Sequence, residues 1–585
     1  MSDVSGLSHD RPDGYHTLRD VTIILVLAAV LLFPSHFTRD LWNPDEPRYM
    51  EVAREMLVLG DYLVPHLNGR IYPDKPPLFF WLTAALYRAG LGFEASRVVS
   101  ALATMGTLML IYGFGRKLLP APGALLAALV TATFALFSAI SRIGAIDPLL
   151  TFFETVALVA AYHALTGSSP RARLCWLIFY GAAGLAVLTK GPVGLAVPAL
   201  VVLVYAILER KRIRAGGWMH LGGVALMLVV VGAWLVPACI RGGEEYTRDI
   251  LFHQSSRYTV KAASHNQGPH YYFMLLPPYL LPWTFFAALA LVQGILDWRR
   301  KGDRAAGYLS LWLICVFAFF TAVTSKRERY LMPLMPAAGL LCGRYFALAL
   351  REAMPWPRLH RWLAVVTFVV TALIATGIAA GFFFSPAIVA SRFPDDAVLR
   401  DRIASLMTAG NLTIVIGASA ILLALSIAGL LRGIGKPAIL RFAVTVTLIM
   451  VTISLFIDLF AFPLADPFKS SREFGRQSLP YLEQAGPSGR FFYQNEFAGV
   501  VNLYTGIIGI PLVREVEGLA DAMRSGEKVV VIGDEKRLAG AVPSLPGPAW
   551  VLVRERVGRR GMALISNYRW DDNARPLEAA AKTEE

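Results

Sequence analysis

The sequence predicts an α-helical protein that crosses a membrane many times. Of its 585 residues, 55% are hydrophobic and only 17% are charged, and the mean hydropathy is +0.51. A soluble domain needs more charge on its surface, so this composition indicates a polytopic membrane protein. The net charge of +14 comes from basic clusters between apolar runs. Such clusters are typical of cytoplasmic loops and do not indicate a nucleic-acid partner.

Apolar runs of roughly 17 to 25 residues predict about thirteen transmembrane helices. These runs lie near residues 21–38, 95–115, 123–141, 147–166, 174–189, 191–208, 217–240, 271–296, 307–323, 330–350, 361–384, 411–431 and 438–460. With a cytoplasmic N-terminus, every inside loop is basic, as the positive-inside rule requires. The outer side then receives the loops 39–94, 142–147, 241–270, 324–329 and 385–410, and the chain after residue 461.

The first outer loop, residues 39–94, carries the densest charge between two apolar runs. Asp45 and Pro47 predict the start of an amphipathic helix at the membrane interface. The apolar segment 77–89 is too short to span a bilayer, so we expect it to be interfacial or partly inserted. Because charge close to lipid is costly, this loop is a candidate functional site.

The pattern changes to short alternating elements after about residue 466. Residues 490–494, 511–516, 528–533 and 550–554 read as strands, and residues 497–504, 519–524 and 535–541 as short helices. The sequence therefore predicts two domains. Residues 1–465 form the transmembrane domain, and residues 466–585 form a small α/β domain on the outer side.

Six motifs recur in an order that resembles a known family. They occupy residues 43–49 with 54–56, 61–66, 72–76, 147–151, 189–192 and 326–333. Together they resemble the aminoarabinose transferase branch of the protein O-mannosyltransferase superfamily. Members of that superfamily are membrane glycosyltransferases of the GT-C fold that use polyprenyl-phosphate sugars. The resemblance extends over nearly the whole chain.

The resemblance implies a site for the lipid phosphate of a sugar donor. It assigns Arg48 and Lys75 as phosphate contacts and the outer motif 326–330 as a further wall of the pocket. The candidate donor-binding residues are Arg48, Tyr72, Lys75, Lys190, Lys326 and Tyr330. Fixed cations stabilise the negative charge that develops on a departing phosphate. The alternative interpretation is that these cations contact lipid headgroups at the interface.

Two carboxylates are the candidate catalytic residues. Asp45 matches the acidic residue of the superfamily's first outer loop, and Asp147 matches a second one at the start of a later helix. They are suited to act as a general base for a hydroxyl acceptor and to orient the cations. The alternative interpretation is that both aspartates cap predicted helix starts.

The resemblance also implies a divalent metal such as Zn, Mg or Mn. In this branch a glutamate before the lysine helps to bind the metal with a histidine from a later outer loop. Here that position holds Asp74, one methylene shorter, and both His253 and His265 lie in the corresponding outer loop. A carboxylate, an imidazole and phosphate oxygens suit a divalent ion. Alternatively, the histidines are ordinary surface residues.

The implied activity is that of a multi-pass transferase in the bacterial inner membrane, with its active site facing the periplasm. It moves a sugar, aminoarabinose or a related one, from undecaprenyl phosphate to an acceptor such as lipid A phosphate, with inversion. The partners are the undecaprenyl-phosphate-linked donor, lipid A or another envelope acceptor, and membrane lipids. No Walker A, dinucleotide or clear DxD motif is present, so we expect no nucleotide cofactor.

Other functions stay open. A protein O-mannosyltransferase, or a transferase for another envelope glycan, would keep the donor site and change the acceptor. A lipid or solute transporter would fit the many spans with interior charge, although two related halves with interrupted helices are not apparent. A third alternative is that the C-terminal domain binds a separate partner and the membrane part only anchors it.

Overall fold

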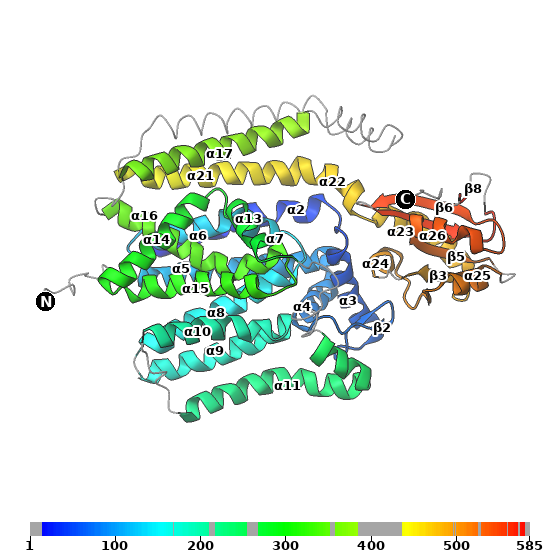
Figure 1. Cartoon of the computed structure of the whole chain (residues 1–585), viewed down its shortest axis with the longest axis horizontal. Helices are drawn as coiled ribbons and strands as arrows, with labels where there is room; N and C mark the ends of the chain where they lie inside the picture. Colours follow the sequence, from blue (N-terminus) through cyan, green and yellow to red (C-terminus); the bar gives the residue numbers. More distant parts are fainter. Residues whose placement is uncertain are drawn as a thin grey trace.

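A computed structural model describes residues 14–167, 169–209, 217–253, 267–351, 357–383, 436–494, 497, 499–524, 528–557, 560–570 and 574–578. In Figure 1 most helices lie side by side along the long axis of the molecule, and a β-sheet lies beyond one end of this bundle. Helix α3 and strand β2, both from the first outer loop, lie between the bundle and the sheet.

The helices of the bundle follow the chain from α1 to α22. Their bounds are α1 (Gly14–Leu32), α2 (Pro34–Thr38), α3 (Asp45–Leu59), α4 (Leu78–Leu86), α5 (Ala95–Leu118), α6 (Gly123–Thr133), α7 (Ala135–Ser141), α8 (Ile146–Thr166), α9 (Ser169–Lys190), α10 (Val193–Leu208), α11 (Gly217–Arg248), α13 (His270–Tyr279), α14 (Thr284–Lys301), α15 (Arg304–Ala322), η4 (Glu328–Leu334), α16 (Met335–Arg351), α17 (Pro357–Phe383), α21 (Lys436–Phe456) and α22 (Phe462–Lys469).

The described residues include eight helices that are long and apolar enough to cross a membrane, or up to ten if each bent pair is one span. The protein is therefore mostly helical and multi-pass, while the count of thirteen stays a prediction. One predicted span, 411–431, lies outside the described residues. The predicted short segment 77–89 contains the nine-residue helix α4, and Gly90, with a φ of 95°, breaks the helical path before α5; its interfacial placement stays a prediction.

Two predicted spans are bent rather than continuous. The run 123–141 consists of α6 and α7, which meet at 67° because Phe134 between them is extended, with ψ 131°. The run 271–296 consists of α13 and α14, which meet at 110°. Pro277 and Pro278 lie in the last turn of α13, where proline supplies no N–H to continue a helix.

The C-terminal unit, residues 472–578, is built on a six-stranded sheet of order β4-β3-β5-β7-β6-β8. Its strands are β3 (Arg490–Tyr493), β4 (Leu512–Val513), β5 (Val530–Asp534), β6 (Trp550–Val557), β7 (Arg560–Ser566) and β8 (Arg575–Pro576), and its helices are α23 (Arg472–Ala485), α24 (Val500–Thr505), α25 (Val516–Arg524) and α26 (Glu535–Ala541). Strand β3 pairs parallel with β4 and β5, and the remaining pairs are antiparallel. Every residue of β5 is buried, as expected of a strand covered on both faces.

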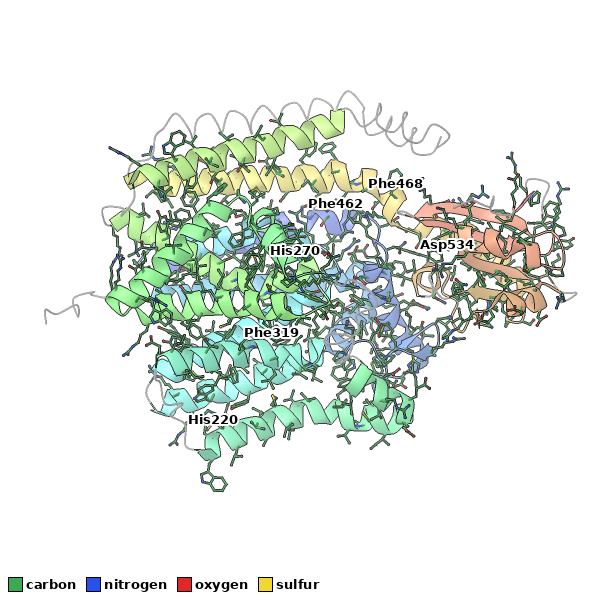
Figure 2. All side chains as sticks on the ribbon, viewed as in Figure 1. His220, His270, Phe319, Phe462, Phe468 and Asp534 are labelled. Carbon is green, nitrogen blue, oxygen red and sulfur yellow. The ribbon has the colours of Figure 1, made fainter. Side chains whose placement is uncertain are left out.

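The first outer loop is attached to helix α22, which leads to the C-terminal unit. The indole N–H of Trp42 donates to Asp466 at 2.7 Å, and the ring packs edge-on against Phe462 at 4.8 Å. Figure 2 labels Phe462 and Phe468 on this helix. The backbone N–H of Asn43 also donates to the carbonyl of Lys469 at 2.9 Å. These contacts fix the segment that leads into α3.

Glu55 holds the turn of the short hairpin formed by β1 (His66–Leu67) and β2 (Arg70–Ile71). Its carboxylate accepts the backbone N–H groups of Asn68 at 2.5 Å and Gly69 at 2.9 Å. The side chain is fully buried, and burial raises the pKa of Glu55 to about 7. Native Glu55 therefore binds a proton more tightly than it does in the unfolded chain.

We predict that Glu55→Gln weakens the dependence of stability on pH. Because the pKa of Glu55 is raised to about 7 in the folded state, its contribution to stability is present at low pH and is lost as the pH rises through 7. The melting temperature in detergent should therefore fall less between pH 5.5 and pH 8 in Glu55→Gln than in the wild type. Glu483→Gln, at an exposed position, is the control. Equal slopes in Glu55→Gln and the wild type would contradict the prediction.

Candidate active site

Asp45, the first residue of α3, is surrounded by three arginines. Its Oδ1 accepts a hydrogen bond from Arg48, one turn along the same helix. Its Oδ2 accepts from Arg329 Nη2 at 2.6 Å and lies 3.5 Å from Arg327 Nη1. Both of these arginines come from the segment before α16, far away in the sequence. The fold therefore brings the first outer loop and the 327–330 segment together at one carboxylate.

Asp147, in the first turn of α8, belongs to the same cluster. Its Oδ1 accepts from Lys190 Nζ at 2.5 Å, and its Oδ2 lies 4.0 Å from Arg329 Nη1. Lys190 also lies 4.2 Å above the ring of Tyr330. Arg329 thus bridges Asp45 and Asp147. We name this group the Asp45 cluster, and its members are Asp45, Arg48, Asp147, Lys190, Arg327, Arg329 and Tyr330.

Local structure explains how several of these side chains are aimed. Lys190 is the last residue of α9, and Gly191 after it has a φ of +81°, the left-handed conformation that commonly ends a helix. Tyr272 fixes Arg327: its hydroxyl donates to the Arg327 carbonyl at 2.9 Å and accepts from the Arg327 N–H at 3.1 Å. Tyr272 is fully buried, so this backbone is held from inside the protein.

Neither aspartate caps its helix. Pro44 and Ala145 occupy the N-cap positions of α3 and α8, and neither helix has a side-chain capping bond. The capping interpretation is therefore wrong, and both carboxylates instead pair with cations. Burial alone raises the pKa of Asp45, but Arg329, Arg48 and Arg327 outweigh it and hold the pKa below its usual value. Asp45 is therefore ionised at neutral pH and is a weak base.

The Asp45 cluster has more positive than negative charge. Arg48, Arg327, Arg329 and Lys190 contribute four positive charges against the two of Asp45 and Asp147. The buried Nε–H groups of Arg48 and Arg329 have no acceptor among the described residues. A buried N–H without an acceptor is costly, and arginine forks suit phosphate oxygens. The arrangement is thus suited to bind an anion beside Asp45.

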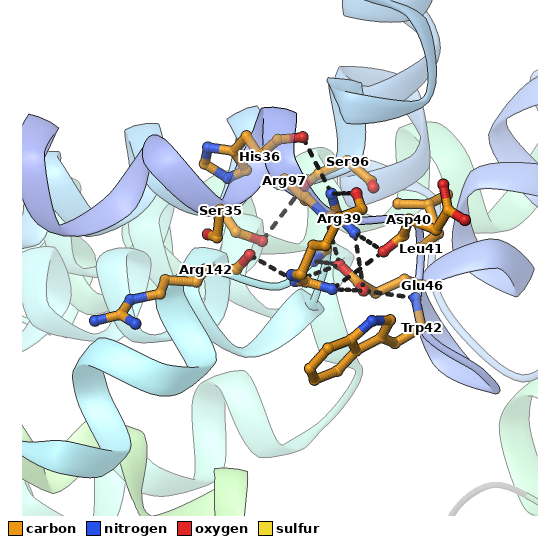
Figure 3. Close-up of polar contacts among 12 residues, drawn as sticks. Ser35, His36, Arg39, Asp40, Leu41, Trp42, Glu46, Ser96, Arg97 and Arg142 are labelled. Carbon is orange, nitrogen blue, oxygen red and sulfur yellow. Dashed lines mark hydrogen bonds and ion pairs between the residues drawn. The ribbon is translucent and has the colours of Figure 1, made fainter. Parts of the chain in front are cut away.

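Glu46, next to Asp45, is the centre of a second, largely buried network (Figure 3). Its carboxylate accepts from Arg39 at 2.7 Å and from Arg97 at 2.8 Å. It also accepts the backbone N–H groups of Trp42 at 2.8 Å and Gly144 at 2.9 Å. Glu46 is 2% exposed. Burial opposes its ionisation, but Arg97 and Arg39 hold the pKa of Glu46 far below its usual value.

The remaining predicted donor-binding residues are not members of the Asp45 cluster. Tyr72 is buried and packs against Phe80, with ring centres 6.3 Å apart, and Tyr72 and Asp74 are both electrostatic neighbours of Arg48. Lys75 is half-buried in the turn that follows. Lys326, by contrast, donates to the carbonyl of Val323 in its own segment.

The predicted metal ligands are only partly described. His265 and the side chain of His253 lie outside the described residues. Within the part of the chain that the structure describes, no group of three His, Cys, Asp or Glu residues is close enough to hold a metal ion. Asp74 has a guanidinium, that of Arg48, as a charged neighbour.

The sequence analysis included Arg329 only as part of the motif 326–330 and gave it no individual role, although it makes the central contact of the Asp45 cluster. It placed Lys326 and Tyr330 at the site from the same motif. Residues 327–329 alternate Arg, Glu and Arg, a pattern that gives two cations two positions apart. Both cations reach Asp45, and the 3-10 helix η4, which begins between them at Glu328, has no signal in the sequence.

Comparisons with known proteins agree with the predicted resemblance. A family model described as dolichyl-phosphate-mannose-protein mannosyltransferase matches residues 74–236. An undecaprenyl phosphate-alpha-4-amino-4-deoxy-L-arabinose arabinosyl transferase of Pseudomonas aeruginosa is 34% identical over 335 residues, which are 56% of this chain and 60% of that protein. A second such transferase, from Pseudomonas fluorescens, is 33% identical over 341 residues, 56% of each chain. The chain thus spans about three fifths of the curated relatives it matches.

Solved structures show the fold. The crystal structure of ArnT from Cupriavidus metallidurans bound to undecaprenyl phosphate has a TM-score of 0.73 at 22% identity, over 95% of this chain and 99% of that one. The archaeal oligosaccharyltransferase AglB from Archaeoglobus fulgidus has a TM-score of 0.53 at 12% identity, over 96% and 75%. The resemblance to the aminoarabinose transferase branch is confirmed, and the chain has the GT-C fold.

We predict that Glu46→Gln lowers the stability of the protein strongly. The substitution leaves two buried guanidiniums facing a neutral amide, and breaking a buried ion pair from one side costs about 3 to 5 kcal/mol. The melting temperature in detergent should fall by several degrees. Glu483→Gln, on an exposed face, should leave it unchanged. A Glu46→Gln protein as stable as the wild type would show that the network is dispensable.

Proposed function

We propose that this protein is a polyprenyl-phosphate-sugar-dependent glycosyltransferase of the bacterial inner membrane. It moves aminoarabinose or a related sugar from undecaprenyl phosphate to the phosphate of lipid A. The observation that carries the proposal is the Asp45 cluster, in which four cations meet two carboxylates and two arginine Nε–H groups have no acceptor among the described residues. The names of the related proteins supply the donor and the sugar.

In the proposed reaction an oxygen of the acceptor attacks the anomeric carbon of the sugar while the bond from that carbon to the donor phosphate breaks. The bonding electrons pass to the departing undecaprenyl phosphate, whose charge Arg48 and Arg329 stabilise. Preorganised cations in a site that excludes water are well suited to this task. The direct displacement inverts the anomeric centre, in keeping with the resemblance.

The electrostatics of Asp45 favour a phosphate acceptor over a hydroxyl acceptor. A hydroxyl must lose its proton during transfer, and Asp45 is a weak base because three arginines hold its pKa low. A phosphate oxygen is already anionic and needs no base. In this account Asp45 orients the arginines and faces the sugar. A protein O-mannosyltransferase, which the description of the matched family model favours, would need a stronger base.

The same proposal includes the finer topology. We propose thirteen spans, a membrane domain of residues 1–465 and a periplasmic α/β domain of residues 466–585, with the Asp45 cluster opening to the periplasm. The contacts of the first outer loop with Asp466 and Lys469 support a common side for the loop and the C-terminal unit. The divalent metal implied by the resemblance stays a prediction, and no step above depends on it.

We predict that Asp45→Asn slows transfer about a hundredfold. Loss of the charge disturbs three arginines at once, and removal of a preorganised electrostatic group costs about a hundredfold in rate. The measurement is mass spectrometry of lipid A from cells that lack the natural protein and carry the wild type or the variant. Asp521→Asn, at an exposed position in the C-terminal unit, is the matched control and should behave as the wild type.

Three outcomes are distinct. Loss of a defined sugar mass from lipid A in Asp45→Asn alone supports the proposal and identifies the sugar. Loss of the mass from a protein or another glycan would contradict lipid A as the acceptor. Normal sugar transfer by Asp45→Asn would contradict the assignment of the site.

A further inference from the structure

The hairpin β1–β2 of the first outer loop turns at Asn68 and Gly69. Both residues have positive φ angles, 56° and 69°, as a two-residue turn between antiparallel strands requires. Glu55 of α3 accepts both N–H groups of this turn. The hairpin is therefore fixed on one side to the helix that begins at Asp45.

On its other side the hairpin is held by the C-terminal unit through one amide. The Nδ2 of Asn68 donates to the carbonyl of Ile510 at 2.8 Å, and its Oδ1 accepts from the N–H of Ile510 at 2.9 Å. The same Oδ1 accepts from Asn502 Nδ2 at 2.9 Å. Asn68 is 3% exposed and Asn502 is fully buried. A single side chain from the membrane domain is thus paired almost like a strand residue with a distant segment.

Asn502 is itself fixed within its own segment. Its Oδ1 accepts the N–H of Gly499 at 2.5 Å, and its Nδ2 also donates to the carbonyl of Ile507 at 2.7 Å. Gly499 has a φ of +84°, and a Cβ there would lie 2.4 Å from Leu67 of the hairpin. A side chain at this position would have to displace Leu67, so the two surfaces pack closely here. The β1–β2 hairpin and the C-terminal unit therefore form a specific, hydrogen-bonded interface.

The hairpin is followed in the chain by residues 72–75, which include electrostatic neighbours of Arg48 in the Asp45 cluster. The N–H of Tyr72, the residue after β2, donates to the carbonyl of Pro65 just before β1 at 2.7 Å. Tyr72 and Asp74 are electrostatic neighbours of Arg48, and Lys75 follows in the chain. Movement of the hairpin would therefore displace Tyr72 and Lys75 relative to Arg48.

We propose that Asn68 and Asn502 are positioning residues through which the C-terminal unit holds the 72–75 segment in place against a lipid phosphate. The inference rests on the proposed function and deepens it, because it gives the C-terminal unit a role in donor binding. The two asparagines act through the hairpin and do not touch the Asp45 cluster themselves.

The test is Asn502→Asp in the full-length protein. Aspartate has nearly the same shape and can still accept from Gly499, but its carboxylate would face the oxygens of Asn68 and Ile507 instead of donating to them. We expect faster hydrogen exchange in residues 66–76 and about tenfold weaker binding of undecaprenyl phosphate, since an unpaired buried polar group destabilises the contact that holds the hairpin. The kcat at saturating donor should change less than twofold.

Two further variants make the test specific. Asn567→Asp is the matched control, because Asn567 makes its hydrogen bonds with Met523 and Val529 inside the C-terminal unit; it should leave donor binding unchanged. Asn68→Gly removes the same amide from the hairpin side and keeps the positive φ. It should weaken binding as Asn502→Asp does, even if Asn502→Asp folds poorly.

The outcomes separate the two proposals. Unchanged exchange in residues 66–76, or unchanged affinity for undecaprenyl phosphate in both Asn502→Asp and Asn68→Gly, would overturn the positioning role. An equal loss of affinity in Asn567→Asp would also overturn it, because the effect would then be a general loss of stability. A wild-type protein that does not bind undecaprenyl phosphate would instead contradict the proposed function.

Discussion

The buried carboxylate of Glu46 is the interaction on which the rest of the site depends. It joins Arg39 before α3, Arg97 on α5, and the N–H of Gly144. Gly144 lies three residues before Asp147, and Glu46 itself lies next to Asp45. One carboxylate therefore fixes the two chain segments that carry the paired aspartates. Arg39, Arg97 and Gly144 are all buried, so water cannot replace a missing partner of these charges. The network must therefore form as a whole.

The two neighbouring acids of α3 thus have different tasks. Glu46 faces the protein interior, where two arginines and two backbone N–H groups satisfy it. Asp45 faces three arginines. The first arrangement is complete without a ligand, whereas the second leaves two arginine N–H groups without an acceptor among the described residues. This contrast supports the interpretation of Glu46 as structural and of Asp45 as functional.

The sequence indicated which charged residues lie together better than it indicated how they are oriented. Asp45, Asp147 and Lys190 were predicted site residues, and the structure brings them together, because motifs of charged residues beside apolar runs are visible in the sequence. Arg329 was predicted only as part of the motif 326–330, because its contact with Asp45 depends on the local backbone at helix η4. Helix α23 was also not predicted, because Gly475 and Pro480 lie within it and both residues usually interrupt helices. The bend at Phe134 likewise depends on packing that hydropathy does not report.

The most direct measurement is a cryo-electron microscopy structure of the full-length protein with undecaprenyl phosphate. The account predicts the phosphate within hydrogen-bonding distance of the Nε–H groups of Arg48 and Arg329, with Asp45 beside it and Lys75 turned toward it. A phosphate bound elsewhere, with Arg48 and Arg329 contacting only Asp45 and the other members of the Asp45 cluster, would contradict the account.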